Sequence, residues 1–137
     1  MSDHDEALQF ISEHRRGVLS TQRRDGGAQM SPVLATVDAE NRVVISTREA
    51  SMKVRNLRRT PRAALCALSQ RFFGEWHVVE GPVEIVSLPE AMEPLVDYYR
   101  RASGEHPDWD DYRAAMQREQ RVLLRITVER SGPARSG

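Results

Sequence analysis

The stretch SMKVRNLRRTPR, Ser51 to Arg62, concentrates charge of one sign between two apolar runs. From Arg48 to Arg62 the chain has six basic residues and one acid, Glu49, although its 20 basic and 20 acidic side chains balance overall. Lys53 is the only lysine. Ser51 can cap a helix with Lys53 in its first turn, and such a helix start offers free N–H groups and a positive dipole end to a phosphate. A solvated basic surface helix is the alternative interpretation.

The composition is typical of a globular domain, with 39% hydrophobic and 29% charged residues and no net charge. Neutrality disfavours non-specific nucleic-acid or membrane binding, which needs a large basic field. No apolar run is long enough to span a bilayer, and the acidic N-terminus is unlike a secretory signal. The single cysteine excludes an internal disulfide. We therefore expect one cytoplasmic domain over residues 1–137, without nucleic-acid or membrane partners.

Apolar alternation and turn signals predict an antiparallel arrangement on both sides of this stretch. Strands are expected over 17–23, 28–38, 42–48, 62–69, 76–87 and 121–129. The fifth strand has a bend at Gly81-Pro82. Because the strands follow one another mostly by hairpins, the fold class is expected to be mainly β (α+β): a small antiparallel barrel with short flanking helices.

Helical patterns are expected in four places. One helix lies within residues 1–16, and the basic helix ends at Thr60-Pro61 because a residue before proline avoids helical angles. Ser87 and Glu90 have the spacing of a capping box, and Asp108 repeats the cap signal before a further helix. Residues 131–137 are expected to form a flexible tail.

Some residues have both a structural and a functional interpretation. Pro32 cannot donate to a ladder, so it belongs at a sheet edge or where a ligand meets the backbone of Ser31, Pro32 and Val33. His77 could act as an imidazole catalyst, but no partner side chain stands in a recognisable arrangement with it. Cys66 most simply packs in the interior, and the scattered histidines predict no metal site. With no catalytic side chain predicted, a cofactor would perform the chemistry.

The order of these features resembles the pyridoxamine-phosphate-oxidase-like superfamily of FMN-binding-type split β-barrels. The best motif is S-x-K-x-x-N-L-x-x-x-P-R, and the second is Val79-Glu80-Gly81 in the bent strand. The resemblance extends from about Gly17 to Val128. Within the superfamily, the chain is most similar to small enzymes that use the deazaflavin coenzyme F-420.

This resemblance implies a homodimer with two cofactor sites at the subunit interface. The cofactor phosphate would meet the start of the basic helix, and the ring would lie along the strand from Met30 to Val33. Trp76 and His77 would close the pocket from the partner chain. The cofactor-binding residues expected in this way are Met30, Ser31, Pro32, Val33, Thr47, Arg48, Ser51, Lys53, Arg55, Asn56, Trp76 and His77.

Two departures separate the chain from a true pyridoxamine-phosphate oxidase. Those enzymes have a pattern similar to R-x-V-L-L-K on the second strand, where this chain reads SPVLAT and has no cation. They also end in a substrate-binding segment with arginine and histidine, which the C-terminal sequence ITVERSGPARSG does not match. The resemblance therefore implies a reductase that passes a hydride from reduced F-420 to an enone, quinone, nitro compound or tetrapyrrole. An FMN-binding oxidoreductase and a non-catalytic protein that binds F-420 or a tetrapyrrole are the alternatives.

Overall fold

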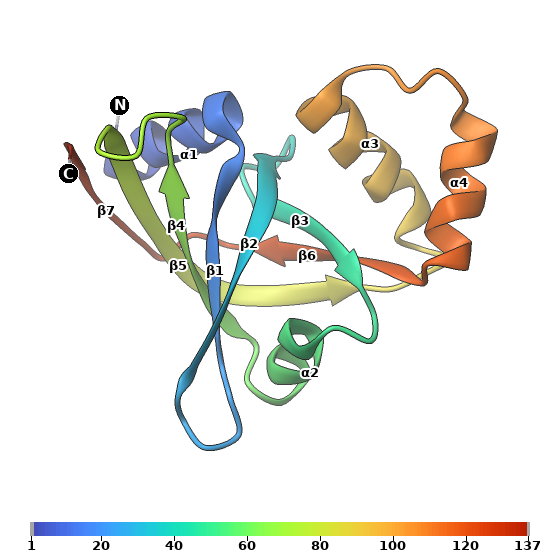
Figure 1. Cartoon of the computed structure of the whole chain (residues 1–137), viewed down its shortest axis with the longest axis horizontal. Coiled ribbons are helices and arrows are strands. Elements are labelled where there is room, and N and C mark those ends of the chain that lie inside the picture. The colour runs from blue at the N-terminus through green and yellow to red at the C-terminus, as the bar shows by residue number, and fades with distance from the viewer. Residues whose placement is uncertain (1, 137) are drawn as a thin grey trace.

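The structure is a computed structural model that describes residues 2–136, within which the chain forms seven strands and four helices (Figure 1). The strands are β1 (Arg16–Gln22), β2 (Ala28–Val37), β3 (Val43–Arg48), β4 (Arg62–Leu68), β5 (Glu75–Val86), β6 (Arg121–Ile126) and β7 (Arg130–Ser136). The helices are α1 (Asp3–His14), α2 (Met52–Arg59), α3 (Met92–Ser103) and α4 (Trp109–Arg118). The six predicted strands are present, and β7 is an additional one.

Six of the strands close into an antiparallel barrel, which confirms the predicted fold class. Their order is β4-β1-β2-β3-β6-β5, and β5 pairs again with β4. Residues 76–82 of β5 pair with β4, whereas residues 83–86 pair with β6. The predicted bend lies at this change of partner. A Cβ atom on Gly81 would collide with the carbonyl oxygen of Thr127, so the strand needs glycine there.

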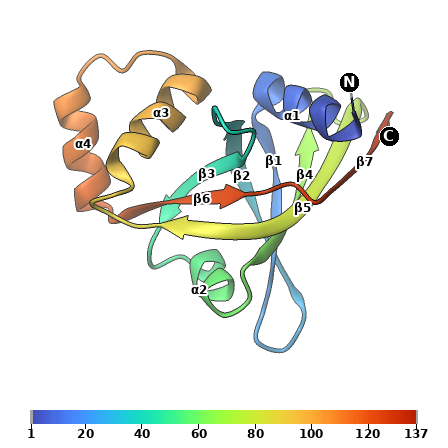
Figure 2. The same cartoon turned by 180° about the vertical axis from the view of Figure 1, so that it is seen from behind.

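Two apolar clusters hold the helices on the barrel. The interior cluster includes Phe10 and Ile11 of α1 and Val54 and Leu57 of α2, and Figure 1 shows these helices at opposite ends of the barrel. The second cluster joins α3 and α4 to outward side chains of β3 and β6. Figure 2 shows that the α3–α4 pair stands apart from α1. Helix α3 packs against β2, β3 and β6, and the Glu49 N–H after β3 donates to the Gln120 carbonyl after α4 at 2.9 Å.

The structure corrects the prediction that residues 131–137 form a flexible tail. Through Ser136 the tail forms β7, which pairs with residues 75–80 of β5. The β6 strand pairs only with residues 83–86 of β5, so the backbone groups of β5 beyond them take their partners from β7. The prediction for Gly137 lies outside the described residues.

The predicted capping box after β5 was also wrong. α3 begins at Met92, and its N-cap Ala91 makes no side-chain hydrogen bond. The Ser87 backbone carbonyl instead closes a turn by accepting from the Ala91 N–H at 2.9 Å, one helical turn before the helix starts. The other cap signal is confirmed, because the Asp108 side chain accepts from the Asp111 N–H at the start of α4.

Candidate functional site: a cationic pocket where two strands separate

The strand β2 has two halves with different partners. Residues 35–37 pair with β3, whereas residues 28–34 pair with β1 alone among the described strands. The Ala35 N–H donates to the Arg15 carbonyl on the β1 side. Backbone groups alternate in direction along a strand, so those of Met30, Pro32 and Leu34 face the gap beside β3. Pro32, which has no N–H, therefore stands at a sheet edge, one of its two predicted settings.

The start of α2 lies beside this gap because β3 leads directly into it. Ser51 is the N-cap, and its hydroxyl accepts a hydrogen bond from Thr47 Oγ1 at 3.3 Å. Further along α2, the buried Asn56 side chain donates to Thr21 Oγ1 on β1 at 3.1 Å. These two contacts fix the helix to strands on both sides of the gap and hold Lys53 of the first turn at its edge.

A cavity of about 500 Å³ occupies the gap. This volume is in the range of small-molecule and cofactor sites. Its lining residues come from β2, β3, the first turn of α2, the α3–α4 pair and the start of β6. They are Pro32, Val33, Leu34, Ser46, Thr47, Lys53, Tyr98, Tyr99, Tyr112, Met116, Glu119 and Arg121.

Positive charge dominates this pocket. Lys53 and Arg121 face a single lining carboxylate, Glu119, which pairs with Arg121 at 2.8 Å and with Arg48 at 3.5 Å. The Arg121 guanidinium lowers the pKa of Glu119. Burial, and then the charge of Arg121, lower the pKa of Lys53, and no carboxylate opposes that shift. A partly buried cation beside another cation is stabilised by a bound anion.

Opposite the strand edge, α3 and α4 supply an aromatic wall. Tyr99 packs edge-on against Tyr112 with 5.0 Å between ring centroids, and Trp109 stands 5.8 Å from Tyr99. The Tyr112 hydroxyl donates to the Leu95 carbonyl at 2.8 Å. Burial raises the pKa of Tyr112 to about 12, so its hydroxyl stays protonated at neutral pH. The wall can pack against a flat ring or an apolar acceptor.

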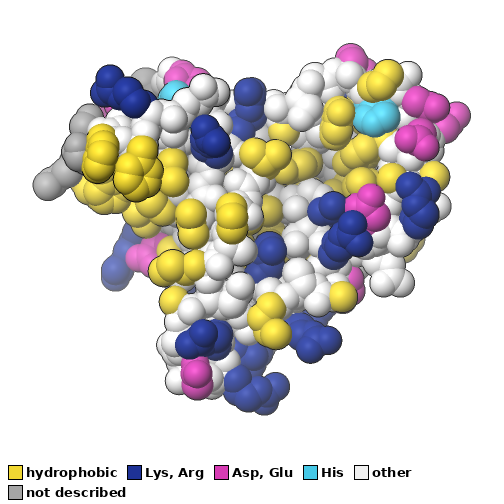
Figure 3. Space-filling model, in the orientation of Figure 1, with side chains coloured by type: hydrophobic (Ala, Val, Ile, Leu, Met, Phe, Trp, Pro, Cys, Tyr) yellow, Lys and Arg dark blue, Asp and Glu magenta, His cyan; other side chains and the backbone are white. Residues whose placement is uncertain are grey.

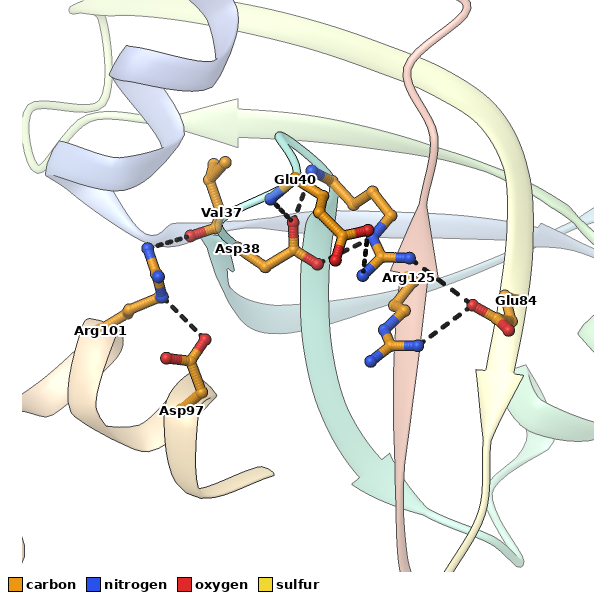
Figure 4. A network of polar contacts seen from close by, with 8 residues as sticks. Val37, Asp38, Glu40, Glu84, Asp97, Arg101 and Arg125 are labelled. Carbon is orange, nitrogen blue, oxygen red and sulfur yellow. Dashed lines mark hydrogen bonds and ion pairs between the residues drawn. The ribbon is translucent and has the colours of Figure 1, made fainter. Parts of the chain in front are cut away.

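A charged network fixes α3 against the end of β2 (Figure 4). Arg101 donates to the Val37 carbonyl at 3.3 Å and pairs with Asp97 at 2.8 Å. Nearby, Arg125 of β6 pairs with Glu84 of β5 at 3.3 Å. The aromatic wall is thus attached to the half of β2 that pairs with β3.

Four predicted site residues line the pocket: Pro32, Val33, Thr47 and Lys53. Ser51 adjoins them through its hydrogen bond with Thr47, and Arg48 adjoins them through its ion pair with Glu119. The structure therefore brings together the half of the predicted set that surrounds the start of α2.

The remaining predicted residues do not line the pocket. Met30 points outward and is 64% exposed, and Arg55 is exposed on α2. Ser31 is on the open half of β2, where its buried Oγ has no hydrogen-bond partner among the described residues. Asn56 holds α2 on β1 instead of facing the pocket.

The two residues expected to close the site from a partner chain differ in setting. His77 is 2% exposed, bonds to Glu75 at 2.7 Å and lies 4.6 Å from the Phe10 ring, so it is buried beneath α1 within its own chain. Trp76 is half-buried on β5 and stands opposite Leu68 of β4. Trp76 alone of the two is placed where a second copy could meet it.

The lining residues of α3, α4 and β6 were not predicted. From sequence, Tyr99 belongs to an apolar helical stripe, and Arg121 is only the first residue of a strand. The register of β3 with β6 places Arg48 opposite Arg121 and Thr47 opposite Val122, a pairing between distant segments. The sequence signal that could have identified the wall is the density of tyrosine and tryptophan between residues 98 and 112.

Within residues 2–136, no three His, Cys, Asp or Glu side chains gather closely enough to hold a metal ion. The acids near residue 110 serve the start of α4, where Asp108 is the cap. None of the described helices combines the length and apolar character needed to cross a membrane.

The chain is similar to known proteins both in sequence, through a family model, and in fold, through solved structures. The model of the family described as pyridoxamine 5'-phosphate oxidase matches residues 3–132. The conserved hypothetical protein Rv2991 from Mycobacterium tuberculosis is 28% identical, with a TM-score of 0.75 over 96% of this chain and 82% of that one. An F-420 reductase is 21% identical, with a TM-score of 0.68 over 96% of this chain and 98% of its own. A heme binding protein from Mycobacterium smegmatis is 18% identical, with a TM-score of 0.70 over 96% of this chain and 53% of its own. The last two similarities concern the fold alone.

Proposed function

The chain belongs to the pyridoxamine 5'-phosphate oxidase family, and on that premise we propose that it is an oxidoreductase that uses reduced coenzyme F-420. Its substrate would be an electron-poor organic acceptor: an enone, a quinone, a nitro compound or a tetrapyrrole. The observation that carries this proposal is the cationic pocket at the start of α2, where the two positive charges of Lys53 and Arg121 outnumber the single negative charge of Glu119.

The residues of the pocket fit a phosphate-bearing ring cofactor. Lys53 and the free N–H groups after Ser51 would hold the phosphate. The open edge of β2 would lie along the ring, since backbone groups of Met30 and Pro32 face the gap. The unpartnered Ser31 hydroxyl on the same half-strand is a further polar group that a bound molecule or a shift of the strand could satisfy.

When bound, reduced F-420 supplies a hydride from its C5 to the acceptor. The aromatic wall of α3 and α4 would orient the acceptor and exclude water from the ring face. A proton from solvent would complete the reduction, which accords with a pocket whose one carboxylate, Glu119, is engaged by two arginines.

FMN is the second candidate cofactor, and family membership favours it. The sequence of β2 disfavours it, because residues 31–36 read SPVLAT where the resemblance to FMN-binding oxidases would require cations. The pocket itself offers its cations from α2 and β6, which suits a phosphate at the helix start.

We propose further that the protein is a homodimer formed through the outer face of β2, β1, β4 and β5. Strand register aligns three rows of outward side chains across this face. The rows are Leu34–Arg16–Leu68–Trp76, Pro32–Val18–Cys66–Val78 and Met30–Ser20–Ala64–Glu80. Figure 3 shows apolar side chains gathered over this side of the barrel, and the neighbouring Phe72 and Phe73 are 77% and 67% exposed.

A groove on this outer face supports a cofactor site near the dimer interface. It has a volume of about 410 Å³ and shares Pro32, Val33 and Leu34 with the cationic pocket. A second copy seated on the face would therefore border the pocket. Val18→Lys places a charge in the central row, and we expect it to convert the dimer to a monomer in light scattering, whereas Val18→Ala should stay dimeric. A monomeric wild type would contradict this assembly.

The cofactor proposal is tested by titrating the purified protein separately with F-420, FMN and FAD, following cofactor fluorescence. We expect saturable binding of F-420 that is tighter than that of either flavin. Consumption of reduced F-420 is then measured with one acceptor from each of the four classes. Tight binding of FMN alone would favour the second candidate, and binding of F-420 without turnover of any acceptor would favour a binding protein.

A further inference from the structure

Two arginines converge on one carboxylate oxygen in the cationic pocket. Glu119 Oε1 accepts from Arg121 Nε at 2.9 Å and lies 2.8 Å from Arg121 Nη2, and Arg48 Nη2 lies 3.5 Å from the same oxygen. Strand register places the two arginines directly opposite each other on β3 and β6. Like charges in such a pair repel, so a nearby anion stabilises them. Glu119 supplies that anion from within the chain.

The backbone around Glu119 fixes the position of its carboxylate. Glu119 is the C-cap of α4, and its N–H donates to the Ala115 carbonyl at 2.9 Å. The next residue, Gln120, has φ +52°, and its carbonyl accepts from the Glu49 N–H at 2.9 Å. The end of α4 is thus tied to the end of β3, and Glu119 is held beside Arg121 by its backbone as well as by its ion pair.

The charges that line the pocket do not cancel. The charged lining residues are Lys53, Arg121 and Glu119, two cations and one carboxylate, which leaves one positive charge. Hydrogen bonding from Arg121 lowers the pKa of Glu119 and keeps it ionised at neutral pH. Residues 31–36 of β2 read SPVLAT and add no cation. The remaining charge therefore matches an anionic group that carries one negative charge.

We propose that Glu119 is a specificity-determining residue, whose fixed charge suits the pocket to a singly charged phosphodiester and disfavours a doubly charged phosphomonoester. Coenzyme F-420 contains a phosphodiester, whereas FMN ends in a monoester, which is mostly dianionic above about pH 7. Since Coulomb energy is proportional to the charge of the ligand, Glu119 opposes a dianion twice as strongly as a monoanion. The inference rests on the proposed function only for the identity of the ring that accompanies the phosphate.

A purely structural role for Glu119 makes a different prediction. If the carboxylate only relieved the repulsion between Arg48 and Arg121, its removal would destabilise the fold and leave Arg121 without a fixed position. Both kinds of phosphate would then bind more weakly. A specificity role requires the opposite: both bind more tightly, and the dianion gains more.

The test uses two phosphates without a cofactor ring, phenyl phosphate as the monoester and methyl phenyl phosphate as the diester. Glu119→Gln removes the charge and keeps an oxygen that can accept from Arg121. By calorimetric titration at pH 8 and low salt, we expect the diester to bind about fivefold more tightly than to wild type and the monoester about 25-fold, the square of that gain. Glu119→Met is a second charge-free variant, so the result does not depend on the folding of one of them.

Glu49→Gln is the matched control. It also removes one carboxylate, but Glu49 pairs with Arg58 on the exposed side of α2 and does not line the pocket. We expect it to change the affinity for either phosphate by less than about twofold. Circular dichroism checks that each variant is folded.

Each outcome of these titrations decides the proposal. A larger gain for the monoester than for the diester in the Glu119 variants, absent from Glu49→Gln, supports it. Equal gains, a weakening of both phosphates, or no binding of either phosphate to any of the proteins overturns it. F-420 and FMN are titrated into the same preparations, and FMN affinity should rise relative to F-420 affinity in Glu119→Gln. If wild type binds neither cofactor but the two phosphates respond as expected, the cofactor proposal fails while Glu119 retains its role.

Discussion

The two halves of β2 are built on different principles. In the half that pairs with β3, Ala35 and Thr36 are 1% and 2% exposed, whereas Met30 and Leu34 of the other half are 64% and 58% exposed. The first half is held by ladder hydrogen bonds and the apolar interior. The second keeps β1 on one side and presents its other edge to a pocket bordered by helices. The candidate site thus lies where the sheet is interrupted, and the closed parts of the barrel hold that interruption in place.

The closed barrel should tolerate change least, and Gly81→Ala tests this. A Cβ atom there would collide with the Thr127 carbonyl, so β5 could not pass from β4 to β6. We expect a loss of several kcal/mol in unfolding free energy, enough to unfold a marginally stable domain. Denaturant unfolding followed by circular dichroism measures it.

Gly104→Ala is the matched control for that change. Gly104 has φ +85° and ψ −162°, a region that essentially only glycine adopts, and nothing lies within 4 Å of an added Cβ, so only backbone strain opposes the substitution, at about 1–3 kcal/mol. Equal costs for the two alanines would show that close packing at the β5 bend does not hold the barrel closed.

An intermediate loss of unfolding free energy is expected for a substitution in α2, the helix that connects the closed barrel with the open half of β2. Asn56→Ala removes the bond to Thr21 Oγ1 and leaves a buried hydroxyl with fewer partners, at a cost of about 2 kcal/mol. Because Asn56 holds the helix that carries Lys53, F-420 affinity should fall as well. Thermal unfolding and cofactor titration of one preparation measure both. Loss of stability with unchanged F-420 affinity would show that the Asn56–Thr21 hydrogen bond does not position Lys53 for cofactor binding.

The division between the two halves also explains what the sequence could predict. Turn residues, apolar alternation and the capping serine are local signals, and they predicted β2, β3, α2 and Lys53 at the helix start, whereas Thr47 was expected in the pocket only from the family resemblance. The aromatic wall depends on the pairing of Arg48 with Arg121, which no local pattern encodes. His77 illustrates the opposite case. A histidine beside Trp76 was expected to close the pocket from a partner chain, but it is buried against Phe10 of its own chain.

Two other corrections have the same physical origin. The tail from residue 131 has the glycine, proline and serine content of a loop, yet it pairs with an edge of β5 left over by β6. The cap signal at Ser87 was overridden because the chain first makes a turn after β5. In both cases tertiary context decided between local alternatives.

The smallest expected effect is a pH dependence that originates in the open half. The pKa of Lys53 is lowered in the folded state, so between this value and the unfolded value of about 10.4 the unfolded chain binds more protons. Stability contributed by this group therefore rises with pH through that window. As pH rises from about 7 toward about 10, the melting temperature of wild type should rise relative to that of Lys53→Met. Parallel curves for the two proteins would contradict the lowered pKa.

The most direct test of the cationic pocket is the F-420 dissociation constant of Lys53→Ala beside that of Arg55→Ala. Both variants remove one positive charge from α2, but only Lys53 lines the pocket. The account predicts a loss of about 100-fold for Lys53→Ala, as for a charge-assisted phosphate contact, and less than about threefold for Arg55→Ala, with both folds intact. Equal losses in the two variants would show that the general charge of the helix, and not the pocket where β2 leaves β3, attracts the cofactor.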